Sequence, residues 1–236
     1  MVNVERDEYI FWILSRLNIA RATDICWLGG FTDLTYARKK LLQLVRMGFI
    51  GFYVIDGYKC YYLLNKGMRE IGKYGRIYEK SYTTYHALEV ARVCTWLYIT
   101  ENVSFEDCFT DKRLSVLFQD KNVHRPDIMC GRNVYEVERT VKTLDRLKKN
   151  MKDNASYERQ VWLTPERKIQ LTKNIQLIAE RNFINNVEIV SLEAVQAEID
   201  RADIHKNVFR PKATLGENGM LTPKTSGKLT KYFERD

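Results

Sequence analysis

The chain lacks several features that would define its class at once. No stretch approaches the roughly 18 consecutive apolar residues of a membrane-spanning helix. The segment from Met1 to Glu8 carries acidic residues where a signal peptide has basic ones before an apolar run. The five cysteines are far apart and never in CxxC spacing, which indicates neither a disulfide framework nor a zinc site. We therefore expect a cytoplasmic protein with reduced, mostly buried thiols and no membrane insertion.

The composition is that of a folded protein whose charge favours an anionic partner. Of the 236 residues, 45% are hydrophobic and 29% are charged, which allows a real core. At roughly 100 to 200 residues per domain, two domains are expected. The 38 Lys and Arg against 30 Asp and Glu give a net charge of +8, which favours nucleic acid or an anionic membrane surface as partner.

Residues 1–80 have the pattern of a winged helix-turn-helix domain. Apolar residues recur at helical spacing, Gly29-Gly30 and Gly48 end two of the helices, and Asp56-Gly57 is a strong hairpin signal between two aromatic-rich runs. Thr32 or Asp33 is expected to cap the third helix. The predicted order is three helices, at 9–17, 22–28 and 34–45, followed by two strands, at 49–55 and 58–64.

The third of these helices is expected to enter the major groove of DNA. Its exposed face and the wing supply the candidate base and phosphate contacts. These DNA-binding candidates are Thr35, Tyr36, Arg38, Lys39, Lys40 and, on the wing, Lys59. Two other interpretations stay open, because a basic helix face is often merely solvated and small winged helices also bind proteins.

Residues 81–203 alternate between helices and strands, which predicts an α/β (α+β) domain with a mixed or partly parallel sheet. A helix broken by glycines at 65–80 leads into it. The expected elements are helices at 85–98, 165–182 and 192–201, a hairpin at 124–130 and 134–138, and strands at 160–163 and 187–191. Residues 204–236 form a basic and mobile tail in this interpretation.

The candidate chemistry lies in the hairpin. Val134, Glu136 and Glu138 alternate along one strand and so share a face, while Asp127 lies on the preceding strand. Three convergent carboxylates bind Mg²⁺ or Mn²⁺, and such an ion would serve phosphodiester cleavage. Basic residues that suit the DNA backbone follow directly: Arg139, Lys142, Arg146, Lys148, Lys149 and Lys152. The competing interpretation is a solvated edge strand with scattered salt bridges.

Pro126-Asp127 followed by Glu136-Val137-Glu138 resembles the PD-(D/E)xK motif of restriction-endonuclease-like nucleases, in its ExE form. The resemblance implies that Asp127 and Glu136 bind the metal. It also implies that Glu138 occupies the position that usually holds a lysine, so Lys142 is the candidate to take over that lysine's role. Glu89 matches in kind the extra acidic metal ligand of many such folds.

The whole arrangement, over about residues 5 to 200, resembles plasmid mobilisation and replication-relaxation proteins, most closely the MobC-type relaxases (the MOBC class). Its three histidines, His86, His124 and His205, form no HUH-type cluster. The resemblance implies metal-dependent nicking of double-stranded DNA at an origin of transfer, which starts conjugative mobilisation. A second mobilisation protein or a coupling protein is an implied partner.

Two alternatives accompany the nickase. The chain could be a non-catalytic, sequence-specific DNA-binding accessory or regulator of plasmid transfer or replication, with the nuclease-like core as a scaffold. It could also be a double-strand endonuclease of a restriction system. Only a cleaving enzyme explains why three carboxylates converge, because buried facing carboxylates are costly without a cation.

Overall fold

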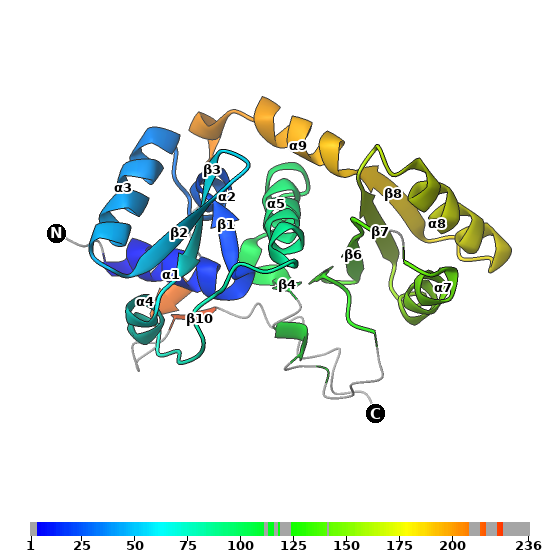
Figure 1. Ribbon diagram of the computed structural model, residues 1–236, viewed down its shortest axis with the longest axis horizontal. Helices are drawn as coiled ribbons and strands as arrows, with labels where there is room; N and C mark the ends of the chain where they lie inside the picture. Colours follow the sequence, from blue (N-terminus) through cyan, green and yellow to red (C-terminus); the bar gives the residue numbers. More distant parts are fainter. Residues whose placement is uncertain are drawn as a thin grey trace. The chain divides into compact units, whose positions relative to one another are not determined.

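The computed structural model describes residues 4–110, 113–115, 118, 124–140, 142–207, 213–215 and 221–223. The chain divides into two compact units, one made of residues 1–91 and 203–236 and the other of residues 92–202 (Figure 1). Each unit combines helices with a sheet, so the expected mixture of α and β structure is confirmed.

The first unit combines helices with a three-stranded antiparallel sheet of order β1-β3-β2. The three predicted helices and the hairpin are present. Strand β1 was not predicted, because three residues carry too little periodicity to be recognised. The elements are α1 (Val4–Leu17), β1 (Ile19–Arg21), α2 (Ala22–Leu28), α3 (Leu34–Arg46), β2 (Ile50–Ile55), β3 (Tyr58–Leu63) and α4 (Asn65–Glu70).

The β2–β3 hairpin turns at the predicted dipeptide. Asp56 and Gly57 have φ values of 50° and 79°, and Ile55 pairs with Tyr58 across the turn. Two consecutive left-handed residues are typical of a type I′ turn, whose twist matches that of the strands. Glycine at the second position avoids the strain that a side chain would bring.

Helix α3 begins as predicted but buries one residue that was expected in solvent. The Asp33 side chain accepts a hydrogen bond from the backbone N–H of Tyr36 at 2.8 Å. Lys40 is only 7% exposed, and its Nζ lies 2.8 Å from Oδ1 of the buried Asp7 on α1. The expectation of an exposed Lys40 was wrong because positions 37, 40, 41 and 44 follow the helical period and form one buried stripe.

The Asp7–Lys40 pair gives a stability prediction. Lys40→Met should lower the free energy of unfolding by roughly 3–5 kcal/mol, because Asp7 would remain as a buried, unpaired charge. Urea unfolding measures the change. The double variant Asp7→Leu/Lys40→Met should recover most of the loss, and Lys39→Met on the exposed face should cost less than about 0.5 kcal/mol. A single-variant loss no larger than that of Lys39→Met would contradict a structural role for the pair.

The helix predicted at 65–80 is much shorter. Helix α4 ends at Glu70, and residues 73–81 have no regular secondary structure. Gly72 has a φ of 63°, and Lys73 N–H bonds back to the carbonyl of Met68 at 2.8 Å. A left-handed glycine with such a bond is a common helix terminator.

The first unit extends beyond the predicted boundary near residue 80. Leu88, on α5 (Thr84–Thr100), packs in a buried cluster with Ile19, Ile55 and Cys60 of the three-stranded sheet. This packing keeps the first half of α5 with the first unit, as far as Ala91.

The start of the predicted tail is ordered where the structure describes it. Buried Asn207 follows η2 (Ile204–Lys206), and its Nδ2 donates to the carbonyls of Trp27 and Phe31 at 3.1 and 3.0 Å. Strands β9 (Ala213–Leu215) and β10 (Leu221–Pro223) pair antiparallel. The remainder of the expected mobile tail lies outside the described residues.

The second unit has a five-stranded mixed sheet of order β4-β5-β6-β7-β8. Strands β4 to β6 are antiparallel and β6 to β8 are parallel, which confirms the expected partly parallel sheet. Its elements after α5 are η1 (Phe105–Asp107), β4 (Cys108–Thr110), β5 (Ile128–Cys130), β6 (Asn133–Val137), α7 (Leu144–Asp153), β7 (Arg159–Thr164), α8 (Ile169–Arg181), β8 (Val187–Ser191) and α9 (Leu192–Arg201).

Helices α7 and α8 cover one face of the parallel strands (Figure 1). Trp162 of β7 is fully buried against Leu147 and Met151 of α7 and against Leu171 and Ile175 of α8. The expected buried thiols are confirmed, since all five cysteines are free and buried. Within the described parts of the chain, no helix has both the length and the apolar character needed to cross a membrane.

Candidate functional site

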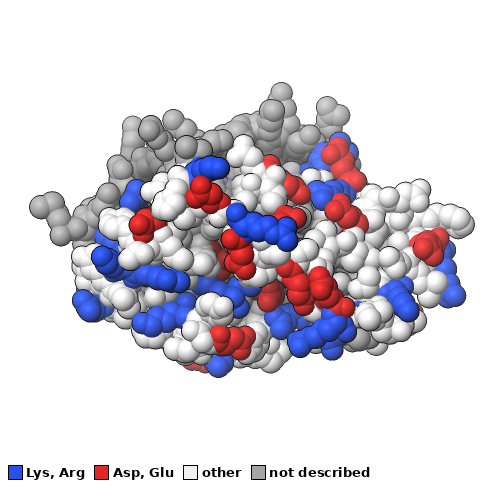
Figure 2. Space-filling view, turned by 90° about the horizontal axis from the view of Figure 1, so that it is seen from above, with Lys and Arg blue, Asp and Glu red and all other residues white. Residues whose placement is uncertain are grey.

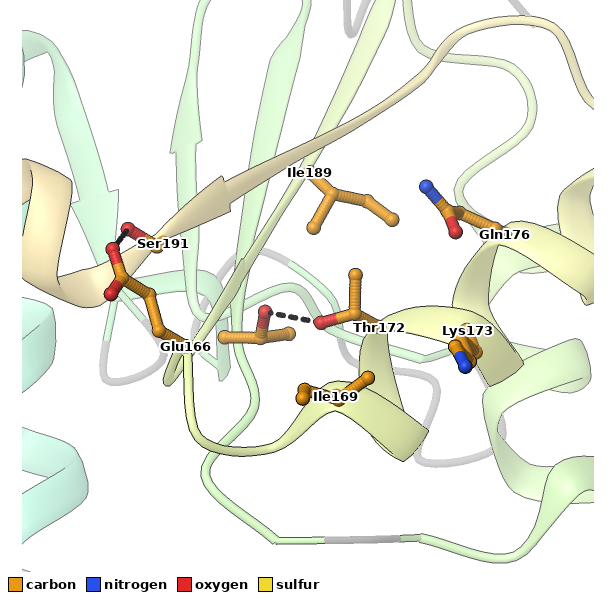
Figure 3. Close-up of a pocket in the computed structure, with 8 residues that line it drawn as sticks. Glu166, Ile169, Thr172, Lys173, Gln176, Ile189 and Ser191 are labelled. Carbon is orange, nitrogen blue, oxygen red and sulfur yellow. Dashed lines mark hydrogen bonds between the residues drawn. The ribbon is translucent and has the colours of Figure 1, made fainter.

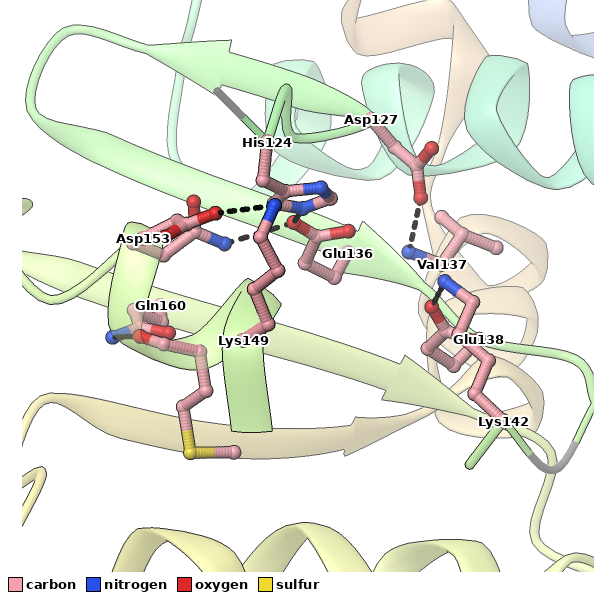
Figure 4. A network of polar contacts seen from close by, with 11 residues as sticks. His124, Asp127, Glu136, Val137, Glu138, Lys142, Lys149, Asp153 and Gln160 are labelled. Atoms are coloured by element: carbon pink, nitrogen blue, oxygen red, sulfur yellow. Dashed lines mark hydrogen bonds and ion pairs between the residues drawn. The ribbon is translucent and has the colours of Figure 1, made fainter. Parts of the chain in front are cut away.

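The β5–β6 hairpin brings the predicted carboxylates together at one end of β6 (Figure 4). Asp127 directly precedes β5, Glu136 lies within β6 and Glu138 directly follows β6. The backbone N–H of Val137 donates to Oδ2 of Asp127 at 2.7 Å, which fixes Asp127 beside the strand that carries both glutamates.

Both glutamates belong to the sheet face that α7 and α8 cover. Glu136 is in register with Trp162, the residue buried beneath the two helices. Glu138 is two residues further on and so shares this face, and its N–H donates to the carbonyl of Leu163 at 2.9 Å. The carboxylates therefore lie at the carboxyl edge of the parallel strands, where open α/β sheets commonly bind ligands.

Glu136 is a buried carboxylate with two side-chain partners. Its Oε1 lies 2.5 Å from His124 Nε2 and accepts a hydrogen bond from Asn154 Nδ2 at 2.8 Å. Burial raises the pKa of Glu136, the hydrogen bond from His124 opposes the rise, and the charge of Asp127 adds to it. Since the His124 side chain is 16% exposed, it connects this buried carboxylate with solvent.

Glu138 is also buried, and its Oε1 accepts a hydrogen bond from Lys142 Nζ. Burial raises the pKa of Glu138 to about 7, although Lys142 lowers it, and the charges of Glu136 and Asp127 raise it further. The three carboxylates are thus close enough to repel one another. Lys142 precedes α7, which begins only at Leu144 after its N-cap, Thr143.

Glu138 should make the protein less stable as pH rises. The unfolded chain releases this proton near pH 4.5 and the folded protein only near 7, so the folded state is penalised increasingly between these values. Glu138→Gln should therefore raise the free energy of unfolding by roughly 1–3 kcal/mol at pH 8 and by little at pH 4.5. Urea unfolding at both pH values checks this, with exposed Glu180→Gln as the control. An equal gain at both pH values would show that the charge of Glu138 is not the cause.

The carboxylate oxygens of the cluster have the chemistry that a hard divalent cation prefers. Carboxylate oxygens are the ligands that Mg²⁺ and Mn²⁺ prefer, and a dication would offset the repulsion between Asp127, Glu136 and Glu138. Across the described residues, however, no three His, Cys, Asp or Glu side chains are arranged around one point that could hold an ion. A cation would have to compete with Lys142 and His124 for the same oxygens. Glu89, the other expected ligand, lies on α5, in the part of this helix that belongs to the first unit.

Helix α7 presents a basic surface next to the cluster. Leu147, Asn150 and Met151 face inward, while Arg146, Lys148, Lys149 and Lys152 are exposed. Lys149 Nζ lies 3.5 Å from Asp153 Oδ2, a weak surface pair, and the Lys149 side chain is 62% exposed. On the face seen in Figure 2, basic and acidic side chains are interspersed.

The exposed face of α3 is a separate basic surface in the first unit. Thr35, Tyr36, Arg38 and Lys39 are exposed as expected. Lys59, on the hairpin, is also exposed, and its ammonium lies 4.9 Å from the centre of the Phe52 ring. Only Lys40 departs from the predicted set, because its side chain is buried against Asp7.

Asp127, Glu136 and Glu138 form the carboxylate cluster. Two residues that bond to this cluster were not predicted as site residues. His124 precedes the Arg125-Pro126-Asp127 run, so its nearness to Asp127 in the sequence was an available signal. Asn154 follows α7 and has no such signal, because only the packing of α7 on the sheet brings it to Glu136.

Comparison of this chain with protein families, with curated proteins and with solved structures gave no match.

Proposed function

We propose that this protein is a metal-dependent DNA nickase that acts as a relaxase at a plasmid origin of transfer and starts conjugative mobilisation. The observation that carries the proposal is that Asp127, Glu136 and Glu138 lie near one another at the end of β6, with Lys142 bonded to Glu138, beside the basic helix α7. Metal ligands and phosphate contacts must be neighbours in an enzyme that cleaves a phosphodiester.

In this proposal Asp127, Glu136 and Glu138 would hold Mg²⁺ or Mn²⁺. The ion would supply Lewis-acid stabilisation of the phosphate and would make a water or hydroxyl easier to deprotonate. Asn154 and His124 orient the Glu136 carboxylate through their hydrogen bonds. Arg146 and Lys149 hold the DNA backbone through their exposed positive charges.

Lys142 supplies the positive charge that a lysine gives in the resembling nucleases. Its Nζ donates a hydrogen bond to Glu138 Oε1, so the ammonium would lie near a phosphate that approaches the carboxylate cluster. A fixed ammonium would stabilise the additional negative charge of the transition state.

We further propose that the first unit is a winged-helix module that selects the DNA site. Replacing Arg38 and Lys39 by alanine should weaken binding to the cognate site and reduce the slope of log affinity against log salt by about 0.9 for each phosphate interaction that is removed. Binding titrations at several salt concentrations measure both. Unchanged binding would instead identify the face as a protein-interaction surface. Lys40 should not be replaced in this experiment, because loss of its buried pair with Asp7 would destabilise the fold.

The proposed activity is tested with supercoiled plasmid that carries the protein's own transfer origin. Incubation with Mg²⁺ or Mn²⁺ should give relaxed open circles, and incubation with EDTA should give none. Linear product from both strands would indicate a restriction-type endonuclease. No relaxation with either metal, despite tight binding to the origin, would contradict the proposed nickase.

One observation favours a second candidate, a non-catalytic DNA-binding accessory or regulator. Each carboxylate of the cluster already has a protein partner: Val137 N–H for Asp127, His124 and Asn154 for Glu136, and Lys142 for Glu138. Such pairing can hold a scaffold together without an ion. In that case Glu136→Gln would change the free energy of unfolding and leave binding to the origin intact. Neither metal would then produce nicked plasmid.

A further inference from the structure

A pocket of about 440 Å³ lies where the ends of β7 and β8 meet α8 (Figure 3). This volume falls within the range of about 300 to 1,000 Å³ that is typical of small-molecule sites. Its lining is mixed, with hydroxyl, carboxylate, ammonium and amide groups together with two isoleucines. A ligand for it would need an apolar body and several polar groups.

The two isoleucines form walls on either side of a polar floor. In Figure 3, Ile169 and Ile189 lie on opposite sides of the Thr172 hydroxyl, which hydrogen-bonds to the hydroxyl of Thr164 at 3.1 Å. Ile169 is 63% exposed, although it lies at the start of a well-packed helix. Aliphatic walls that are partly open to solvent suit a flat ring with polar edges, such as a nucleobase.

The two ends of the pocket carry complementary groups. Glu166 Oε1 accepts a hydrogen bond from Ser191 Oγ at 2.9 Å, while the exposed Lys173 and Gln176 lie at the other end (Figure 3). A carboxylate accepts hydrogen bonds from the amino group of a base, and an ammonium pairs with a phosphate. A nucleotide offers a partner for each of these two groups.

The pocket and the carboxylate cluster share one edge and one face of the sheet. Glu138 N–H donates to the carbonyl of Leu163, the next residue is Thr164, and Thr164 is in register with Ser191. Glu136, Trp162 and Ile189 are also in register across the three parallel strands. Two strand spacings, about 10 Å, therefore separate Glu138 from Ser191.

We propose that this pocket holds one unpaired nucleotide of the DNA strand that is cut at the carboxylate cluster. The base of this nucleotide lies between Ile169 and Ile189, and the nucleotide's own phosphate, which is not the one that is cut, lies beside Lys173. The proposal rests on the nickase function, because it takes the nicked strand as the ligand. Taking a base out of its stack and pair is energetically unfavourable, and contacts with this pocket would offset part of that loss.

Binding of a short, fluorescent single-stranded oligonucleotide in EDTA tests the pocket without any metal or cleavage. Ile169→Ala and Lys173→Ala should each weaken binding by roughly fivefold or more, since each removes an interaction with the nucleotide. The controls Leu177→Ala and Arg181→Ala make matched changes on α8 outside the pocket and should alter affinity by less than about twofold. Equal losses for Lys173→Ala and Arg181→Ala would overturn the proposal, because they would show only general attraction to the helix.

The plasmid assay separates failure of this proposal from failure of the nickase. If Ile169→Ala and Lys173→Ala both nick the plasmid with metal at the wild-type rate, the proposed role of the pocket is overturned. The nickase proposal is then still supported. Pocket-dependent binding of the oligonucleotide without any nicking supports the nucleotide site and overturns the enzyme. Excess free deoxynucleoside monophosphate should displace the oligonucleotide only weakly, whereas full displacement by the free nucleotide would overturn the assignment to a DNA strand.

Discussion

Glu136→Gln and Asp127→Asn should each lower the rate of plasmid nicking by roughly 10³-fold or more, while DNA binding stays near normal or tightens. Both changes keep the size of the side chain and remove one anionic metal ligand. Metal-ion stabilisation of the transition state amounts to several kcal/mol, and each 1.4 kcal/mol corresponds to about tenfold in rate. Loss of negative charge also removes repulsion of the DNA phosphates.

The measurement is the single-turnover nicking rate beside an affinity titration of the same variants. These isosteric changes protect the fold, because the amide oxygen that replaces the Asp127 carboxylate can still accept from the N–H of Val137. The amide that replaces the Glu136 carboxylate likewise keeps an acceptor for Asn154. Glu158→Gln, an exposed glutamate in the second unit, is the matched control and should leave the rate unchanged. Parallel loss of binding and nicking would argue that Asp127 and Glu136 only hold the structure together.

Lys142→Ala should reduce the nicking rate by roughly 10²-fold or more, with little change in affinity. Its ammonium lies on Glu138, at the edge of the sheet where the phosphate is expected. A missing catalytic charge cannot be replaced by adding protein, so the deficit should persist at saturation. Lys149→Ala is the matched control, since this lysine is exposed on α7 and its loss should be recovered at high protein concentration.

The pH profile gives a second readout for Lys142. Its ammonium lowers the pKa of Glu138, so without it Glu138 should hold its proton to higher pH. The wild-type rate should level off about one pH unit above 7, where Glu138 is ionised, whereas the rate of the Lys142→Ala variant should continue to rise with pH. If the deficit disappears at saturating protein, Lys142 is one of the general backbone contacts together with Arg146 and Lys149.

Local sequence patterns by themselves determined most of the secondary structure. The helices at 22–28 and 192–201 and the strand at 187–191 have the predicted bounds. Asp56-Gly57 set the hairpin turn, and Asp33 capped α3. These features depend on neighbours in the sequence, because periodicity, capping and turn conformation involve only a few consecutive residues.

Only the tertiary structure decided which polar groups meet. Asn154 reaches Glu136 because α7 packs on the sheet, and His124 joins them although it carried no site assignment. Lys40 was expected in solvent, but its place between Ala37 and Leu44 turns it toward Asp7 of another helix. The first unit continues to Ala91 because Leu88 packs on its sheet. The contacts of Asn154, Lys40 and Leu88 join residues far apart in the sequence, so no local pattern identifies the partner of each residue.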